Sequence, residues 1–300
     1  MTVFQFPGQG SQFAGMGRSL AKAFPAAKDI FDRADRALGF PLSELCFQGP
    51  EEALKLTENT QPAILTVSVA AWAVLRERIE PAFVTGHSLG EYSALVAAGS
   101  LDFEDAVRIV RLRGRYMQEA VPAGAGAMAA LRVAESEIDG ILGRAAQGEV
   151  LQAANFNAPD QVVIAGTAAA VDRALTLARG LKLPVSAPFH CDLMKPAQER
   201  LAADLAALPF ADLKVPSVNN VRAELVRSGG DARQGLIDQV PSSVRWTDAI
   251  RLLRAQGATT YIEIGPKAVL TGLLKKIDHT ATGLKFGEAE DLDPLLTALT

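Results

Sequence analysis

The chain has 300 residues, 49% hydrophobic and 21% charged, which is typical of a globular protein with one or two domains. Its net charge of −4 argues against a general affinity for nucleic acid or anionic membranes, and we expect neither a signal peptide nor a membrane span. Its two cysteines and three histidines are too widely spaced for a disulfide framework or a metal site, and they fit a reducing cytoplasm.

The first 120 residues alternate short apolar runs with stretches of helical periodicity. Strands are predicted at Val3–Phe6 and Phe83–Thr85, and a glycine-rich loop at Gly8–Gln12 follows the first of them. Apolar residues at helical spacing predict four helices, over Ala26–Leu38, Pro62–Leu75, Glu91–Ala98 and Asp102–Met117. This alternation indicates an α/β fold, a mainly parallel sheet with helices on both faces.

A small-residue linker at Pro122–Gly126 precedes a segment with a different order of elements. The pattern β-α-β-β-α-β of a split βαβ, or ferredoxin-like, unit is predicted from Met128–Val133, Ser136–Ala146, Val150–Asn155, Val162–Ala165, Ala168–Arg179 and Leu183–Ser186. We therefore expect residues 124–187 to form a small inserted subdomain, and residues 1–123 and 188–300 to form a large α/β domain.

The α/β pattern resumes after His190. Helices are predicted at Met194–Leu208, Trp246–Gln256 and Ala268–Ile277, and strands at Val215–Asn219 and Thr260–Ile264. The tail from Gly283 to Thr300 carries little signal.

The segment Gly86–Gly90 reads Gly-His-Ser-Leu-Gly between a predicted strand and a predicted helix. Gly-x-Ser-x-Gly in this context is the pattern of a nucleophile elbow, a turn too tight for side chains around the serine. The hydroxyl of Ser88 is then expected above the carboxyl edge of the sheet, at the positive end of the next helix. The pattern predicts a serine nucleophile.

A serine nucleophile needs a base and a site that holds an oxyanion. His190 begins a loop where the insert returns to the large domain, so it is the candidate base, with a packed core histidine as the alternative. We expect His87 to be structural and His279 to lie at the surface. The backbone N–H of Leu89 is expected in the oxyanion hole. The loop around Gln9 either supplies the second donor or is an ordinary tight turn.

Arg113 lies on a mostly apolar helix face with Ile109, Val110 and Met117. A buried arginine without a partner is costly. Either an internal carboxylate forms a salt bridge with it, or a substrate carboxylate is held there by two parallel N–H···O bonds.

Five motifs between about residue 1 and about residue 278 resemble, in order, those of the malonyl-CoA:acyl carrier protein transacylases of bacterial fatty acid synthesis. They are Pro7–Gln12, Gly86–Leu95, Arg111–Arg115, Phe189–His190 and Glu263–Pro266. The segment Glu263–Lys267 departs slightly from the more common Gly-Pro-Gly, which affects only the expected shape of that loop.

The resemblance implies a hydrolase-like large domain and a role for each matching residue. It implies that Ser88 is the nucleophile that carries a malonyl ester and that His190 is its general base, oriented by the carbonyl of Gln239. The N–H groups of Gln9 and Leu89 would form the oxyanion hole. Arg113 would anchor the malonyl carboxylate, and Asn157 and Phe189 would be substrate-binding residues.

The implied reaction is ping-pong transfer of malonyl from malonyl-CoA to acyl carrier protein, in the cytoplasm, without a metal or other cofactor. It would serve fatty acid or polyketide synthesis. An α/β-hydrolase is one alternative, although only about eighty-five residues precede Ser88 and no aspartate stands out as an orienting acid. A binding subunit that does not turn over is another.

Overall fold

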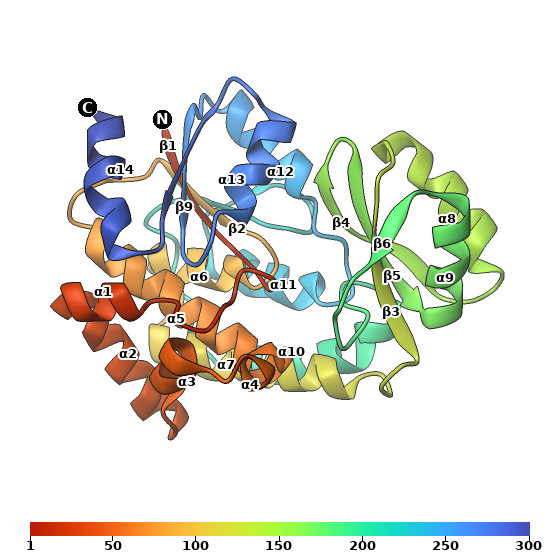
Figure 1. The fold of residues 1–300 in the computed structure, drawn as a ribbon, viewed down its shortest axis with the longest axis horizontal. Helices are drawn as coiled ribbons and strands as arrows, with labels where there is room; N and C mark the ends of the chain where they lie inside the picture. Colours follow the sequence, from red (N-terminus) through yellow and green to blue (C-terminus); the bar gives the residue numbers. More distant parts are fainter.

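The computed structural model describes residues 1–300 and has two β-sheets flanked by helices (Figure 1). The first sheet has six strands in the order β10-β9-β1-β2-β7-β8, and all pair in parallel except β8, which is antiparallel to β7. The strands are β1 Thr2–Phe6, β2 Phe83–Gly86, β7 Ser217–Val218, β8 Leu225–Val226, β9 Thr260–Ile264 and β10 Thr282–Phe286. The predicted α/β class is confirmed.

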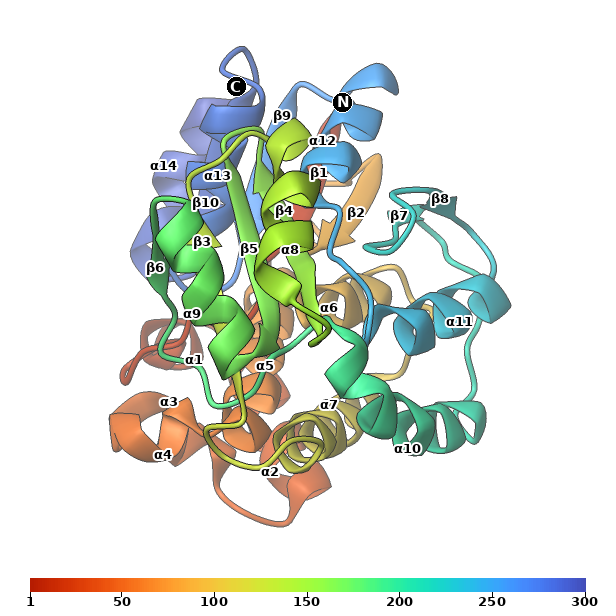
Figure 2. The ribbon, with the colours of Figure 1, turned by 90° about the vertical axis from the view of Figure 1, so that its right-hand side faces the viewer.

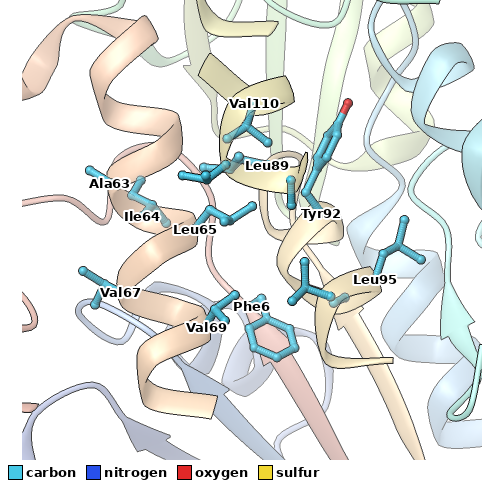
Figure 3. Packing of buried hydrophobic residues seen from close by; sticks show 14 of the residues in the cluster. Phe6, Ala63, Ile64, Leu65, Val67, Val69, Leu89, Tyr92, Leu95 and Val110 are labelled. Carbon is cyan, nitrogen blue, oxygen red and sulfur yellow. The ribbon is translucent and has the colours of Figure 1, made fainter. Parts of the chain in front are cut away.

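Helices cover both faces of this sheet because alternate strand side chains are apolar on both sides. Phe4 and Phe6 face the core that includes α5 (Thr57–Leu75), α6 (Gly90–Ala97) and α7 (Phe103–Glu119), whereas Val3 faces α12 (Trp246–Ala255) and α13 (Val269–Ile277). Figure 3 shows Leu65 and Val69 of α5 pointing toward Phe6 and toward α6. Each such buried side chain contributes roughly 1.5–3 kcal/mol.

The remaining helices lie around this core. They are α1 Arg18–Ala23, α2 Pro25–Leu38, α3 Leu42–Gln48, α4 Glu51–Lys55, α10 Lys195–Ala206, α11 Gly229–Gln239 and α14 Leu292–Leu299, with 3-10 turns at Glu135–Glu137, Asp192–Met194 and Ala289–Asp291. No helix combines the length and the apolar composition that crossing a bilayer requires.

The second sheet has four antiparallel strands in the order β4-β5-β3-β6. The strands are β3 Gly126–Leu131, β4 Leu151–Ala158, β5 Gln161–Thr167 and β6 Gly180–Lys182, and the helices between them are α8 Ile138–Ala146 and α9 Ala168–Leu177. Both helices lie over the face that is turned away from the first sheet (Figure 2).

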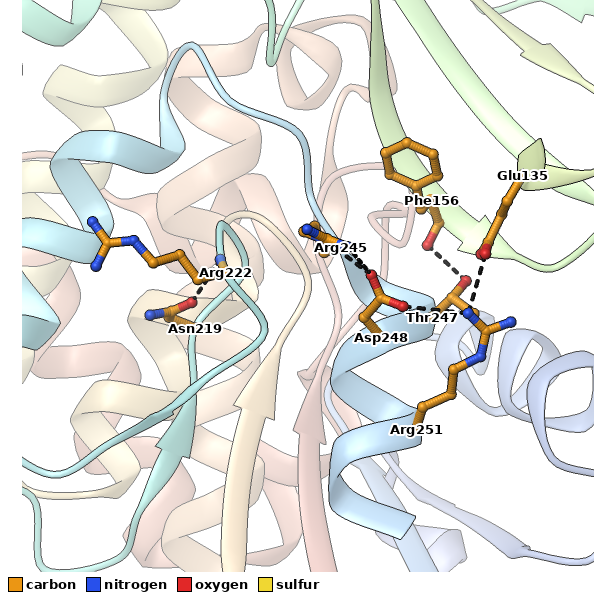
Figure 4. Close-up of polar contacts among 8 residues, drawn as sticks. All are labelled: Glu135, Phe156, Asn219, Arg222, Arg245, Thr247, Asp248 and Arg251. Atoms are coloured by element: carbon orange, nitrogen blue, oxygen red, sulfur yellow. Dashed lines mark hydrogen bonds and ion pairs between the residues drawn. The ribbon is translucent and has the colours of Figure 1, made fainter. Parts of the chain in front are cut away.

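The second sheet is attached to the large sheet's layer along β4. The N–H of Val244 donates to the carbonyl of Ala154 at 2.8 Å, and the N–H of Phe156 donates to the carbonyl of Val244 at 2.9 Å. The hydroxyl of Thr247 donates to the Phe156 carbonyl at 3.0 Å, and Arg251 pairs with Glu135 at 3.1 Å (Figure 4). Main-chain bonds therefore hold β4 in register against Val244, just before α12.

Two predicted boundaries were wrong. Pro62 does not open its helix, because α5 begins five residues earlier at Thr57. In its first turn the Thr60 hydroxyl donates to the Leu54 and Leu56 carbonyls. The last strand of the insert is Gly180–Lys182 rather than Leu183–Ser186. All three β6 residues are exposed, so they carry no apolar pattern. The tail that gave little signal contains β10 and α14.

Candidate active site

Ser88 lies in a tight turn between β2 and α6 and has φ 52°, in the left-handed region that side chains rarely adopt. A Cβ at Gly86 would lie 2.0 Å from the backbone of Gly90, so only glycine allows the chain to close here. The Ser88 N–H donates to Asn220 Oδ1 at 2.6 Å. The predicted strand-turn-helix context of the serine is confirmed.

His190 lies within hydrogen-bond reach of the serine, with Ser88 Oγ 2.7 Å from His190 Nε2. The other ring nitrogen, Nδ1, is 3.0 Å from the main-chain oxygen of Gln239, the last residue of α11. The last carbonyls of a helix lack intrahelical partners, and this oxygen accepts from the Ser242 N–H at 3.2 Å and has a second lone pair for His190 Nδ1. A carbonyl can only accept, so Nδ1 carries the proton and Nε2 is left as the acceptor for the serine hydroxyl.

The imidazole of His190 is 4% exposed and uncharged at neutral pH. Burial, the larger cause, and the positive charge of Arg113 together lower the pKa of His190 to about 3. The side chain is therefore available as a base throughout the physiological range.

Arg113 is brought to the serine by close packing of α7 on α5. The side chain of Asp102 caps α7, accepting from the N–H of Glu104 at 2.9 Å. A Cβ at Gly114 would lie 2.5 Å from the Thr57 carbonyl oxygen, so glycine permits the two helices to approach. Arg113 lines the pocket and is 2% exposed.

All the hydrogen-bond partners of Arg113 are uncharged. Its Nη1 donates to Gln61 Oε1 at 2.8 Å, and its Nη2 donates to Gln239 Oε1 at 2.8 Å and to Ser88 Oγ at 3.2 Å. Its Nε has no partner, and no carboxylate lies within 4.0 Å of the guanidinium. The salt bridge to an internal carboxylate, one of the two interpretations open from the sequence, is absent.

Ser88, His190 and Arg113 open onto a pocket of about 810 Å³ between the two sheets. Its other lining residues are Gln9, Gly10, Gln12, Glu52, Lys55, Leu56, Gln61, His87, Leu89, Met117, Met128, Asn155, Leu183, Pro184, Val185, Ser186 and Phe189. The apolar pattern at Leu183 and Val185, predicted as a strand, belongs to this lining. Phe189 is 7% exposed.

The backbone N–H groups of Gln9 and Leu89 donate to no other group of the protein. Both residues line the pocket beside Ser88. Two free N–H donors at this position are what stabilisation of an oxyanion requires.

Asn157 does not belong to the pocket lining, whereas Asn155 does. The Oδ1 of Asn157 lies 2.8 Å from His87 Nε2, and the His87 ring packs against Trp246 with 5.5 Å between ring centres. His87 thus has partners away from Ser88, in line with a structural role, and His279 is exposed as expected.

Three residues that contact this machinery were missed from the sequence: Gln61, Glu91 and Asn220. Asn220 follows the predicted strand Val215–Asn219, so its place at the carboxyl edge of the sheet was a usable signal. No local pattern predicts the contacts of Gln61 with Arg113 or of Glu91 with Gln239, because these four residues lie on four different helices, α5, α7, α6 and α11.

The sequence of residues 3–287 matches the acyl transferase domain family. A protein of Bacillus subtilis strain 168 named malonyl CoA-acyl carrier protein transacylase is 47% identical over 306 residues, covering 99% of this chain and 96% of the relative. The chain belongs to the malonyl-CoA:acyl carrier protein transacylase family.

Solved structures of this family agree with the fold. The acyl carrier protein S-malonyltransferase of Vibrio cholerae superposes with a TM-score of 0.95 at 46% identity and covers 98% of this chain and 99% of its own. A malonyl-transacylase solved in complex with the holo acyl carrier protein of a type II polyketide synthase has a TM-score of 0.96 at 44% identity, with 99% coverage of both chains. Membership of this family excludes the α/β-hydrolase alternative, and no carboxylate contacts His190.

Proposed function

We propose that the protein transfers malonyl from malonyl-CoA to the phosphopantetheine thiol of acyl carrier protein, for fatty acid or polyketide synthesis. The observation that carries this proposal is the buried guanidinium of Arg113, 3.2 Å from Ser88 Oγ and without a carboxylate partner. The free carboxylate of a malonyl group is a planar anion that an arginine binds with two parallel hydrogen bonds. An acyl group bearing that anion would place its thioester carbon at Ser88.

In the first half-reaction Ser88 Oγ attacks the thioester carbonyl while His190 Nε2 takes the hydroxyl proton. The negative charge on the carbonyl oxygen is stabilised by the N–H groups of Gln9 and Leu89. The C–S bond then breaks, and His190 returns the proton to the sulfur of CoA. The products are malonyl-Ser88 and free CoA.

The second half-reaction reverses these steps with a different thiol. His190 takes the proton of the phosphopantetheine thiol, and the sulfur attacks the ester carbonyl of malonyl-Ser88. The Ser88 oxygen leaves, and His190 returns the proton to it. Malonyl-carrier protein and the free enzyme result.

Two further residues are proposed to shape the acyl site, and a third to orient the base. Phe189 lies beside His190 in the pocket wall and would occupy the volume that a branched acyl group needs. Asn157 would act through His87, which does line the pocket, by holding its ring at 2.8 Å. Gln239 would orient His190 through its main-chain carbonyl.

Residues 124–187 are proposed to form an inserted ferredoxin-like subdomain on the large, hydrolase-like domain of residues 1–123 and 188–300. The strand order β4-β5-β3-β6, with α8 and α9 on one face, supports this assignment. The chemistry above uses only side chains and backbone groups of the protein, so no cofactor is proposed. The cytoplasmic location stays a prediction.

Incubation with malonyl-CoA followed by whole-protein mass spectrometry tests the proposal. A transacylase retains one malonyl group on Ser88 and loses it when holo acyl carrier protein is added. Release of malonate with no adduct would indicate a hydrolase. Binding of malonyl-CoA with neither outcome would indicate a subunit without turnover.

A further inference from the structure

Glu91 is a buried acid that neither half-reaction uses. It lies in the first turn of α6, three residues after Ser88, and is 2% exposed. Its Oε2 accepts two hydrogen bonds, from Gln239 Nε2 at 2.7 Å and from the N–H of Asn220 at 3.2 Å. It forms no salt bridge, and burial raises the pKa of Glu91 to about 7. Burial of a carboxyl group without a charged partner is unfavourable, so we looked for what its hydrogen bonds contribute.

The first bond fixes the carboxamide of Gln239. Its NH₂ group donates to Glu91 and to the Ser88 carbonyl at 3.0 Å, which leaves its oxygen to accept from Arg113 Nη2 at 2.8 Å. If the amide were flipped, its NH₂ group would face the Arg113 guanidinium, and two hydrogen-bond donors would point at each other. The same residue's main-chain oxygen holds His190. Gln239 therefore links the base to the cation, and Glu91 sets its orientation.

The second bond fixes Asn220, whose side chain spans the elbow. Asn220 Oδ1 accepts from the Ser88 N–H at 2.6 Å, and its Nδ2 donates to the Gly86 carbonyl at 2.7 Å. These bonds hold Ser88 at its strained φ of 52°. Both contacts that begin at Glu91 Oε2 thus end on atoms of the reaction centre.

We propose that Glu91 is a positioning residue: the reach of its Oε2, rather than its charge, holds Gln239 and Asn220 so that His190, Arg113 and Ser88 keep their mutual geometry. The inference rests on the proposed function, since the reaction being positioned is acylation of Ser88. It is testable because reach and charge are separated by two conservative substitutions.

Glu91→Asp keeps the charge but withdraws the carboxylate by one methylene, about 1.5 Å. Glu91→Gln loses the charge but can place its amide oxygen where Oε2 lies. Its NH₂ group then takes the place of Oε1, an atom that accepts no hydrogen bond in the parent. A misplacement of about 1 Å in a reaction centre can cost on the order of 100-fold in rate. We expect Glu91→Asp to slow single-turnover malonyl loading at saturating malonyl-CoA at least tenfold, and Glu91→Gln to stay within about threefold of the parent.

Glu263 provides the matched control. It is also a fully buried glutamate that accepts two backbone N–H bonds, from Leu270 at 3.0 Å and Thr271 at 2.7 Å, and burial raises its pKa too. Both bonds come from the first turn of α13, and neither donor lines the pocket. Glu263→Asp and Glu263→Gln should lower the melting temperature without changing the loading rate per folded molecule.

Two further readouts distinguish positioning from general damage and from a wrong function. The Kd of CoA, measured by calorimetry, should stay unchanged in Glu91→Asp, because CoA carries no acyl group to align. The rate at which a fluorophosphonate labels Ser88 should fall with the loading rate, and this probe does not depend on malonyl recognition. A parent that is labelled but not malonylated would refute the proposed function while the Glu91 comparison still proceeds with the probe.

Loss in Glu91→Gln with retention in Glu91→Asp would overturn the proposal in favour of a role for charge. Parent-like rates in both variants, or an equal loss in the Glu263 pair, would overturn it in favour of a purely structural role.

Discussion

His190 Nδ1 donates to the main-chain oxygen of Gln239 at 3.0 Å, where a Ser-His-Asp triad has a carboxylate. A carbonyl fixes the same tautomer and ring orientation, but it carries only a partial charge, reinforced here by its place at the carboxyl end of α11. The imidazolium formed during acyl transfer is thus stabilised by a helix terminus rather than by a buried acid.

Removal of the nucleophile or the base should stop the chemistry and leave the fold intact. We expect Ser88→Ala to abolish malonyl loading and His190→Ala to slow both half-reactions by roughly 10²–10⁴-fold, the usual range for a general base. Ser93→Ala is the matched control, because Ser93 lies on α6, the helix that follows the elbow, and has a buried hydroxyl without a partner. Intact-mass measurement of the adduct after mixing with malonyl-CoA provides the rates. Malonyl transfer by Ser88→Ala at the parent rate would refute the assignment of the nucleophile.

The depressed pKa of His190 predicts a stability difference that depends on pH. The unfolded chain binds a proton at this histidine below about pH 6.5, whereas the folded chain does so only near pH 3. The parent should therefore lose stability relative to His190→Gln as pH falls from about 6.5 toward 3, by an amount on the order of a few kcal/mol. Denaturant unfolding of both proteins at about pH 7, 6, 5 and 4 measures the difference. Parallel stability curves would show that the imidazole is not shielded from protons.

Phe189 should restrict acyl groups that carry a branch next to the thioester. Its ring lines the pocket and is 7% exposed, so Phe189→Ser opens the volume that an α-methyl group needs. One methyl group is worth about 1–3 kcal/mol of discrimination, and the ratio of methylmalonyl-CoA to malonyl-CoA kcat/KM should rise accordingly. Phe189→Leu, which retains most of the apolar bulk, should change the ratio less. An unchanged ratio in Phe189→Ser would remove this residue from the specificity argument.

Local patterns predicted the parts of the site that depend on one short segment. Ser88 was found because its elbow needs only a strand, two glycines and a helix in sequence. The apolar helix face drew attention to Arg113 but left an internal salt bridge open, and its substrate role came from the resemblance of the Arg111–Arg115 motif. Glu91 and Gln61 were missed because their partners, Gln239 and Arg113, come from distant helices. The spacing of apolar residues within one helix does not indicate which side chains of another helix it contacts.

The fold, like the site, was predicted where it depends on local sequence patterns. The alternation of apolar runs predicted the α/β class and nearly all the longer elements. Errors arose where an apolar pattern had another cause, as at Leu183–Ser186, which lines the pocket, or where tertiary contacts overrode a local rule, as at Pro62 inside α5. The edge strand β6 is exposed along its whole length and gave no pattern at all.

The central claim is that Arg113 holds the carboxylate of the malonyl group, and kcat/KM for malonyl-CoA and acetyl-CoA in Arg113→Ala tests it most directly. Removing one partner of a desolvated charge pair costs about 2–5 kcal/mol, so malonyl transfer should fall more than tenfold. Acetyl transfer should rise, because acetyl-CoA no longer covers an unpaired guanidinium. Arg111→Ala is the control: it removes another cation of α7, whose guanidinium carbon lies 4.2 Å from the centre of the Phe40 ring. It should leave the ratio of the two kcat/KM values unchanged. Parallel loss of malonyl and acetyl transfer in Arg113→Ala would contradict the claim.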